Sequence, residues 1–221
     1  MFKKPSILLI ILSAFTVGFF LSLIPKHDQL NETLIFFPLD PDAFYTEAKT
    51  SLDFLTSKDA DEYILKWNVK SLLNQTSYLR QDVSLLFEDG YLKDTLSLWK
   101  EDADLIQLEK GVFGEDSGHY EAITLHHAEI HYPNDVLKSA QMMSFDQLYV
   151  FDSPLSSFHA FKIPETTEEE EGKRILDYIL QQQMTFLKGD LLEHFSIPSA
   201  SYESIPLSRF ARFQNESLAN G

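Results

Sequence analysis

The sequence predicts an α+β protein: an N-terminal transmembrane helix, then one domain in which helices are followed by a small antiparallel sheet and a long C-terminal helix. Three observations support this prediction. Residues 7–24 are uncharged and apolar, residues 40–90 carry apolar side chains at helical spacing, and residues 105–163 show alternating runs broken by glycine and proline. With 221 residues, 44% of them hydrophobic, the chain is long enough to bury a core.

The N-terminal stretch has the length of a membrane span. Lys3 and Lys4 precede the 18 uncharged residues 7–24, and Pro25 and Lys26 follow them. At about 1.5 Å per residue the stretch is roughly 27 Å long, close to the bilayer core thickness of about 30 Å. We expect an uncleaved signal anchor, because a cleaved signal peptide has a shorter apolar centre and small residues at its cleavage site. A cleaved signal and a buried core helix are the alternatives.

Charge is distributed unevenly along the chain. The net charge is −16, but all 34 acidic side chains and only 15 of the 18 basic ones lie in residues 27–221, which gives that part −19. The two lysines before the apolar stretch place the N-terminus in the cytoplasm and the rest of the chain outside. An acidic domain argues against nucleic acid as a partner and attracts cations and basic protein surfaces.

The chain contains no cysteine. This excludes disulfides, thiol catalysis and cysteine-ligated zinc, and it favours a bacterial cell envelope over a eukaryotic exported protein, which would usually carry disulfides. Three Asn-x-Ser/Thr sequons, at Asn31, Asn74 and Asn215, point the other way. We predict a single-pass protein of the bacterial cell membrane with its C-terminal domain outside.

The chain divides into four parts: a signal anchor (1–26), a tether (27–39), an extracytoplasmic α+β domain (40–215) and a tail (216–221).

Helices are expected in the first half of the domain. Asp40 is suited to cap a helix with Pro41 at its first position, and Asp59–Glu62 has the pattern of a capping box. A further amphipathic run stops at Asp89 and Gly90, where glycine can take the left-handed conformation that ends a helix. The apolar spacing in these runs is that of buried helical stripes.

Strands and a closing helix are expected in the second half. Residues 105–113 and 119–132 are interpreted as a β-hairpin, with further strands at 145–152 and 158–163. Five glutamates then lead into a long amphipathic helix, where they complement the helix dipole. Its apolar positions are Ile175, Leu176, Ile179, Leu187 and Leu191, and an edge strand is expected near Ile205–Leu207.

One histidine cluster has the residue types of a metal site. In a strand, His127, Glu129 and His131 share one face, while the more apolar face that holds His126 meets the core. The two outer histidines would be about 13 Å apart, at about 3.3 Å per residue, beyond comfortable reach of one ion. Structural histidines are the favoured interpretation, and zinc held by these three residues is the alternative.

A second candidate site lies in a loop rich in serine and proline with aromatic flanks. Such loops on a rigid scaffold are candidate recognition surfaces. Its proposed binding residues are Phe151, Ser153, Phe158 and His159.

These observations favour a membrane-anchored, extracytoplasmic binding or assembly protein of the bacterial cell envelope. Its partners would be the membrane, through the N-terminal helix, and an envelope protein or a second copy of the chain. No catalytic residue and no cofactor is predicted. The alternative is a metal-dependent envelope hydrolase that uses His127, Glu129 and His131.

Overall fold

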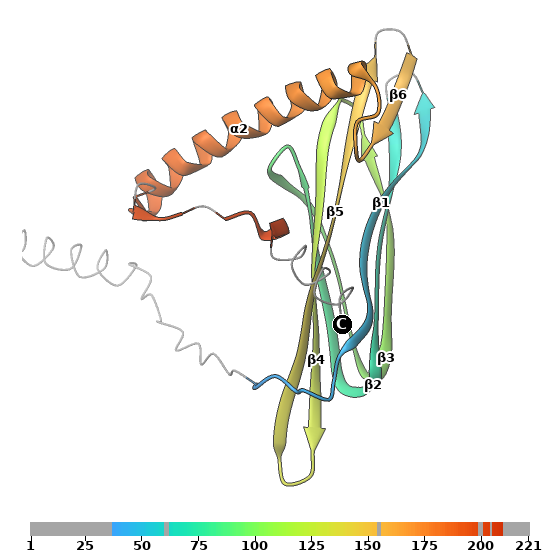
Figure 1. The fold of residues 1–221 in the computed structure, drawn as a ribbon, viewed down its shortest axis with the longest axis vertical. Coiled ribbons are helices and arrows are strands. Elements are labelled where there is room, and N and C mark those ends of the chain that lie inside the picture. The colour runs from blue at the N-terminus through green and yellow to red at the C-terminus, as the bar shows by residue number, and fades with distance from the viewer. Residues whose placement is uncertain (1–36, 60–61, 154–155, 199–200, 204, 210–221) are drawn as a thin grey trace, which may run out of the picture. The chain divides into compact units, whose positions relative to one another are not determined.

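The computed structural model describes residues 37–59, 62–153, 156–198, 201–203 and 205–209. Six β-strands dominate this part of the chain, and one long α-helix follows them (Figure 1). Their bounds are β1 Tyr45–Asp59, β2 Glu62–Glu88, β3 Tyr91–Gly114, β4 Gly118–Tyr132, β5 Val136–Ser153, β6 Ser156–Phe161 and α2 Thr167–Phe195. The prediction of helices before a small sheet is therefore wrong: residues 45–59 and 62–88 are strands, and the fold is mostly β.

Strands β2 and β3 form one long antiparallel ribbon that folds over on itself. Asp89 (φ 49°) and Gly90 (φ 86°) make the turn between them, so this dipeptide closes a hairpin and does not end a helix. The pairing shifts between Leu72 and Ser77, and Asp102 opposite has a positive φ of 47°.

Two contacts show that the ribbon returns over itself. Lys110 Nζ lies 2.6 Å from Asp94 Oδ2, although both residues belong to β3 and are 16 positions apart. Leu65 and Leu86, from the two ends of β2, lie in one buried cluster. The sheet thereby forms two facing layers: a β1 layer with the first half of β2, and a β4 layer with its second half, β5 and β6.

The strand order is β1-β2-β4-β5-β6, with β3 on the other edge of β2. Leu79 of β2 pairs with Glu101 of β3 on one side and with Glu129 of β4 on the other. The predicted strands at 105–113 and 119–132 therefore exist, but they do not form the predicted hairpin. The predicted strand at 145–152 lies in the second half of β5, whose first half was not predicted, and the one at 158–163 covers the last four residues of β6 and two beyond it.

The wrongly predicted helices have a local explanation. Asp40 does not cap a helix, because its carboxylate accepts hydrogen bonds from Tyr132 Oη (2.6 Å) and Lys138 Nζ (3.3 Å). The burial in β2 alternates strictly from Tyr63 to Leu73, which is the period of a strand with one face in the core. Long-range pairing thus prevailed over apolar spacing that also fits a helix.

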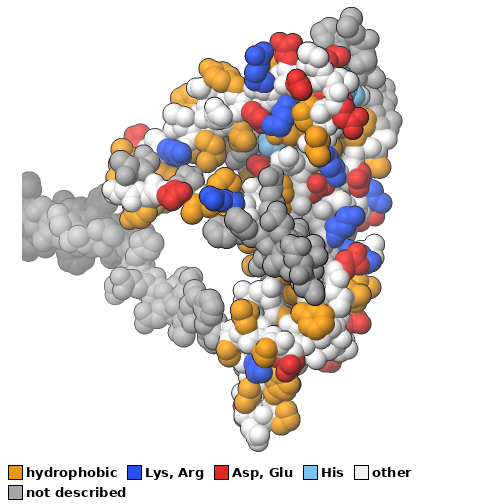
Figure 2. Space-filling view, in the orientation of Figure 1, with side chains coloured by type: hydrophobic (Ala, Val, Ile, Leu, Met, Phe, Trp, Pro, Cys, Tyr) orange, Lys and Arg blue, Asp and Glu red, His pale blue; other side chains and the backbone are white. Residues whose placement is uncertain are grey.

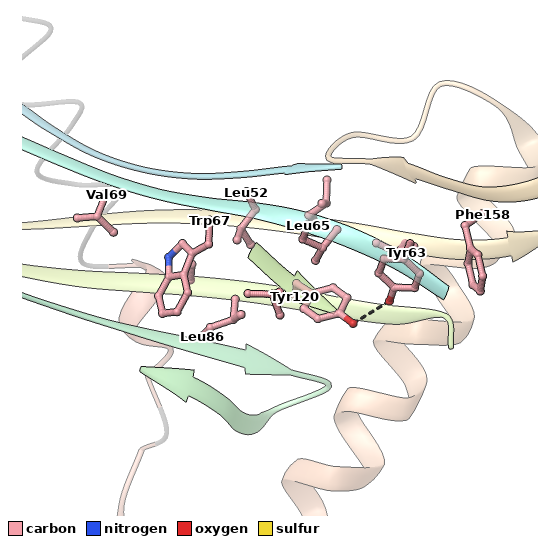
Figure 3. Packing of buried hydrophobic residues seen from close by; sticks show 12 residues of the cluster. Leu52, Tyr63, Leu65, Trp67, Val69, Leu86, Tyr120 and Phe158 are labelled. Carbon is pink, nitrogen blue, oxygen red and sulfur yellow. Dashed lines mark hydrogen bonds between the residues drawn. The ribbon is translucent and has the colours of Figure 1, made fainter. Parts of the chain in front are cut away.

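Two apolar clusters fill the space between the layers. The larger one contains Tyr63, Leu65 and Trp67 of β2 against Tyr120 of β4 and Phe158 of β6 (Figure 3). The second contains Tyr45, Leu73, Ala128, Ile130 and Met142 among others. Buried polar side chains separate the two clusters along β2 and β4.

The closing helix is confirmed. α2 begins at a capping box in which Thr166 Oγ1 accepts from Glu169 N and the Glu169 carboxylate accepts from Thr166 N. The expected edge strand at Ile205–Leu207 is wrong, because Leu207 begins a short helical turn. Across the described stretches, no helix is long and apolar enough to cross a membrane. The predicted signal anchor and the tail 216–221 lie outside the described residues.

Candidate functional site

The histidine cluster lies on strand β4, as the alternation predicts. His126, Ala128 and Ile130 are buried, whereas His127 and Glu129 are half-buried on the outer face. His127 Nε2 lies 3.7 Å from Glu129 Oε1. The predicted division of this strand into two faces is therefore confirmed.

The structure does not bring the three proposed metal ligands together. His131 stacks on Tyr78 with ring centroids 3.8 Å apart, whereas His127 pairs with Glu129. Within the described ranges, no group of three or more His, Cys, Asp or Glu side chains is placed to hold a metal ion. The zinc interpretation thus receives no geometric support.

The proposed recognition residues mostly serve packing. Phe158 is only 6% exposed and lies 4.8 Å from Tyr63, centroid to centroid, in the larger cluster. Phe151 is half-buried, and its ring meets His159 edge-on at 5.9 Å. Ser153 ends β5, and its side chain lies outside the described part. These aromatic side chains hold β6 and the first turns of α2 in place.

A shallow acidic hollow adjoins this segment. It is lined by Phe158 and four carboxylate side chains: Glu62, Glu115, Asp116 and Asp152. The hollow fits the expectation that the domain attracts cationic groups.

Sequence reasoning missed a buried polar array between the layers. His126 Nδ1 lies 2.8 Å from Asp82 Oδ2, and its Nε2 lies 2.8 Å from Ser144 Oγ. Ser71 Oγ donates to the same Asp82 oxygen at 2.6 Å, and Arg80 Nη2 donates to Ser71 Oγ at 2.6 Å. The apolar spacing around Asp82 predicted a helix, so no pattern in the sequence indicated that this carboxylate would contact His126.

The order Asp82, His126, Ser144 matches the hydrogen-bond pattern of a serine hydrolase triad. Burial decides against that role, because Asp82 and His126 are fully buried and Ser144 is 2% exposed. The serine hydroxyl is also engaged by Thr50 Oγ1 at 2.6 Å. A nucleophile in this position cannot meet a substrate, so the array joins β1, β2, β4 and β5 as a structural element.

The first turns of α2 pack against the β4 layer. Gly172 lies against the ring of Phe151, where an added Cβ would be 3.0 Å from Phe151 Cδ2. Leu176 is 2% exposed and joins a cluster with Tyr149 and Phe161. Tyr149 Oη donates to Asp177 Oδ1 at 3.0 Å. The helix is thus held by a small contact near its beginning.

His119 lies beneath this contact. Its ring stacks on Tyr149 at 4.2 Å, and Tyr149 stacks on Phe161 at 5.4 Å. Burial lowers the pKa of His119 to about 4, against an opposing effect of Asp177. The imidazole is therefore neutral at pH 7.

The remainder of α2 presents uncovered apolar side chains. Tyr91 Oη donates to Gln183 Oε1 at 2.6 Å, and we define the distal segment of α2 as the residues beyond it, 184–195. Only Gly172 and Leu176 of the whole helix are buried. The exposed apolar residues of the distal segment are Met184 (38%), Phe186 (67%), Leu191 (42%), Leu192 (54%) and Phe195 (69%). Figure 2 shows hydrophobic side chains along this helix.

Comparisons with known proteins show no family. No family model matches the chain, and no curated protein matches it. Among solved structures, it is similar to a glycosyl hydrolase family 2 member from Bacteroides cellulosilyticus DSM 14838, with 7% identity and a TM-score of 0.31. That match covers 54% of this chain and 17% of the hydrolase chain. A likeness this low carries no functional argument.

Proposed function

We propose that the chain is a membrane-anchored, extracytoplasmic binding or assembly protein of the bacterial cell envelope, and that the distal segment of α2 is its contact surface. The exposed apolar side chains of that segment carry the proposal. Large exposed apolar side chains are typical of docking surfaces, and an amphipathic helix is a common element of recognition. Function would thus reside in α2, with the sheet as its rigid support.

Membrane attachment is proposed from the sequence. The 18 apolar residues 7–24 follow two lysines, and the absence of cysteine favours a bacterial envelope. In this arrangement the N-terminus lies in the cytoplasm and the acidic domain outside.

The partner that fits is an envelope protein with an apolar groove and a basic rim. The groove would cover Met184, Leu191 and Phe195, which are exposed and, at spacings of seven and four residues, lie on one face of α2. The basic rim follows from the net charge of −19 over residues 27–221, because like-charged surfaces repel. A second copy of this acidic chain is the less favoured occupant for the same reason.

Co-purification from membranes tests this proposal. The full chain is crosslinked mildly in cells and recovered as the native form, as Phe195→Glu and as Phe44→Glu, a matched exposed phenylalanine just before β1 (53% against 69% exposed). We expect the native chain and Phe44→Glu to recover the same partner, and Phe195→Glu to lose about tenfold, the loss expected of an interface anchor. Equal recovery with both variants would show that α2 is not the contact surface. Recovery of only the chain itself would identify a homo-oligomer.

The alternative of a metal-dependent hydrolase has no specific observation in its favour. His131 stacks on Tyr78, and no group of three His, Cys, Asp or Glu side chains within the described ranges is placed to hold a metal ion.

A further inference from the structure

The end of the β4 layer where the chain enters the fold carries exposed apolar side chains. The turn between β4 and β5 lies at this end, and residues 37–40 cross β5 at Ser139, above that turn (Figure 1). Ser139 N donates to Pro38 O at 2.9 Å, and Asp40 N donates to Ser139 O at 2.8 Å. We call this region, residues 37–40 with 131–138, the hairpin end.

Two large aliphatic side chains of the hairpin end are exposed, Leu39 (68%) and Val136 (46%). Beside them, Tyr78 of β2, 48% exposed, stacks on His131 at 3.8 Å. In Figure 2 the lower end of the molecule shows several hydrophobic side chains and few charged ones.

The hairpin end carries three charged side chains, and two of them form a pair. The Asp40 carboxylate is buried, and it accepts hydrogen bonds from Tyr132 and Lys138. Asn134 and Asp135 form the turn itself, both with positive φ, and the Asp135 side chain is exposed. The formal net charge of this region is therefore −1, against −19 for residues 27–221.

We propose that the hairpin end rests on the lipid surface of the membrane that holds residues 7–24, an inference that depends on the proposed signal anchor. Twelve residues, 25–36, link that segment to Phe37. The link joins the described domain at the hairpin end, where Ser139 Oγ donates to Phe37 O at 3.1 Å. Fully extended, the twelve residues reach at most about 40 Å, which is an upper bound on the distance between this end and the bilayer. Because the link makes this contact intramolecular, even a weak affinity of the hairpin end for lipid suffices to hold it against the bilayer.

The chemistry of this surface fits a bilayer interface. Tyrosine and aliphatic side chains favour the headgroup region, whereas an acidic surface is repelled by anionic lipid. The domain would therefore stand on Leu39, Val136 and Tyr78, with its acidic surfaces away from the membrane.

Single cysteines test this placement, because the native chain has none. Val136→Cys and a control, Glu115→Cys in the turn at the opposite end of β4, are labelled with an environment-sensitive NBD fluorophore in the full chain. Each protein is reconstituted in vesicles of phosphatidylethanolamine with a minority of phosphatidylglycerol. We expect emission at position 136 to shift to shorter wavelength and to be quenched by a nitroxide-bearing lipid, with neither effect at position 115. Adding Leu39→Glu should reduce both effects without releasing the chain from the vesicles.

Each other outcome contradicts a defined part of the proposal. If the chain floats with the vesicles but position 136 keeps its aqueous emission, the lipid contact is wrong and the signal anchor stands. A shift that the nitroxide lipid does not quench would mean that protein covers this surface, which also overturns the contact. A chain that does not float contradicts the anchor, and the lipid contact with it.

Discussion

At the residue scale, the buried array around His126 pairs many of the buried polar atoms, while Arg80 Nε and Asp82 Oδ1 have no hydrogen-bond partner among the described residues. Both ring nitrogens of His126 have partners, Asp82 and Ser144, in two neighbouring strands. Arg80 and Asp82 are both fully buried, and the guanidinium lies 5.0 Å from the centroid of the Tyr45 ring. Such networks stabilise a fold when satisfied and are costly when one member is removed.

Two adjacent histidines give a matched test of this array. We expect His126→Ala to lower the free energy of unfolding by about 3 kcal/mol, because it leaves a cavity and deprives Asp82 and Ser144 of a partner. His127→Ala should change it by less than about 0.5 kcal/mol, since that ring is partly exposed on the outer face. Chemical denaturation measures both values. Equal effects would contradict the structural role of His126.

His119 predicts a pH dependence of stability. Its pKa is about 4 in the folded protein, because burial disfavours the charged ring, and about 6.5 when unfolded. The unfolded chain therefore binds the proton first, and stability falls as the pH decreases from about 6.5 to about 4. The difference between these two pKa values corresponds to a loss of about 3 kcal/mol in the free energy of unfolding. His119→Phe, which retains a ring against Tyr149, should remove most of this loss in denaturation experiments over that range. An unchanged loss in the variant would contradict the assignment.

At the element scale, α2 was predictable and the early strands were not. The start of α2 depends on local contacts between Thr166 and Glu169, which a short sequence window contains. In β2, Tyr63, Leu65 and Trp67 alternate as in a strand, but the apolar residues after them also fit a helix. Asp89 and Gly90 suit either a hairpin turn or a helix end, and only the pairing of β2 with β3 decides between them.

Two glycines of α2 offer a matched test of its attachment. We expect Gly172→Leu to lower stability by about 2 kcal/mol and to speed amide exchange in the first turns of α2, because the side chain would collide with Phe151. Gly189→Leu has no atom within 4 Å of the added Cβ and should leave the exchange of these turns unchanged. If Gly172→Leu is tolerated as well as Gly189→Leu, the first turns of α2 are not held by this contact.

At the scale of the whole molecule, the folded-over ribbon creates features that no local pattern contains. It brings Asp94 beside Lys110 and places Asp82 between His126 and Ser71. The candidate contact surface on α2 is likewise only partly visible in the sequence. The sequence shows the apolar residues of the helix, but their exposure follows from the fold, because the sheet packs only against the first part of α2.

Site-specific photocrosslinking tests the central claim, that the distal segment of α2 binds a partner, most directly. A photoreactive amino acid replaces Phe195 in the full chain, and in a separate control it replaces Phe44. We predict that irradiation of cells links position 195 to one distinct envelope protein and position 44 to none. Crosslinks from position 44 to the same protein, or the absence of any adduct at position 195, would contradict the claim.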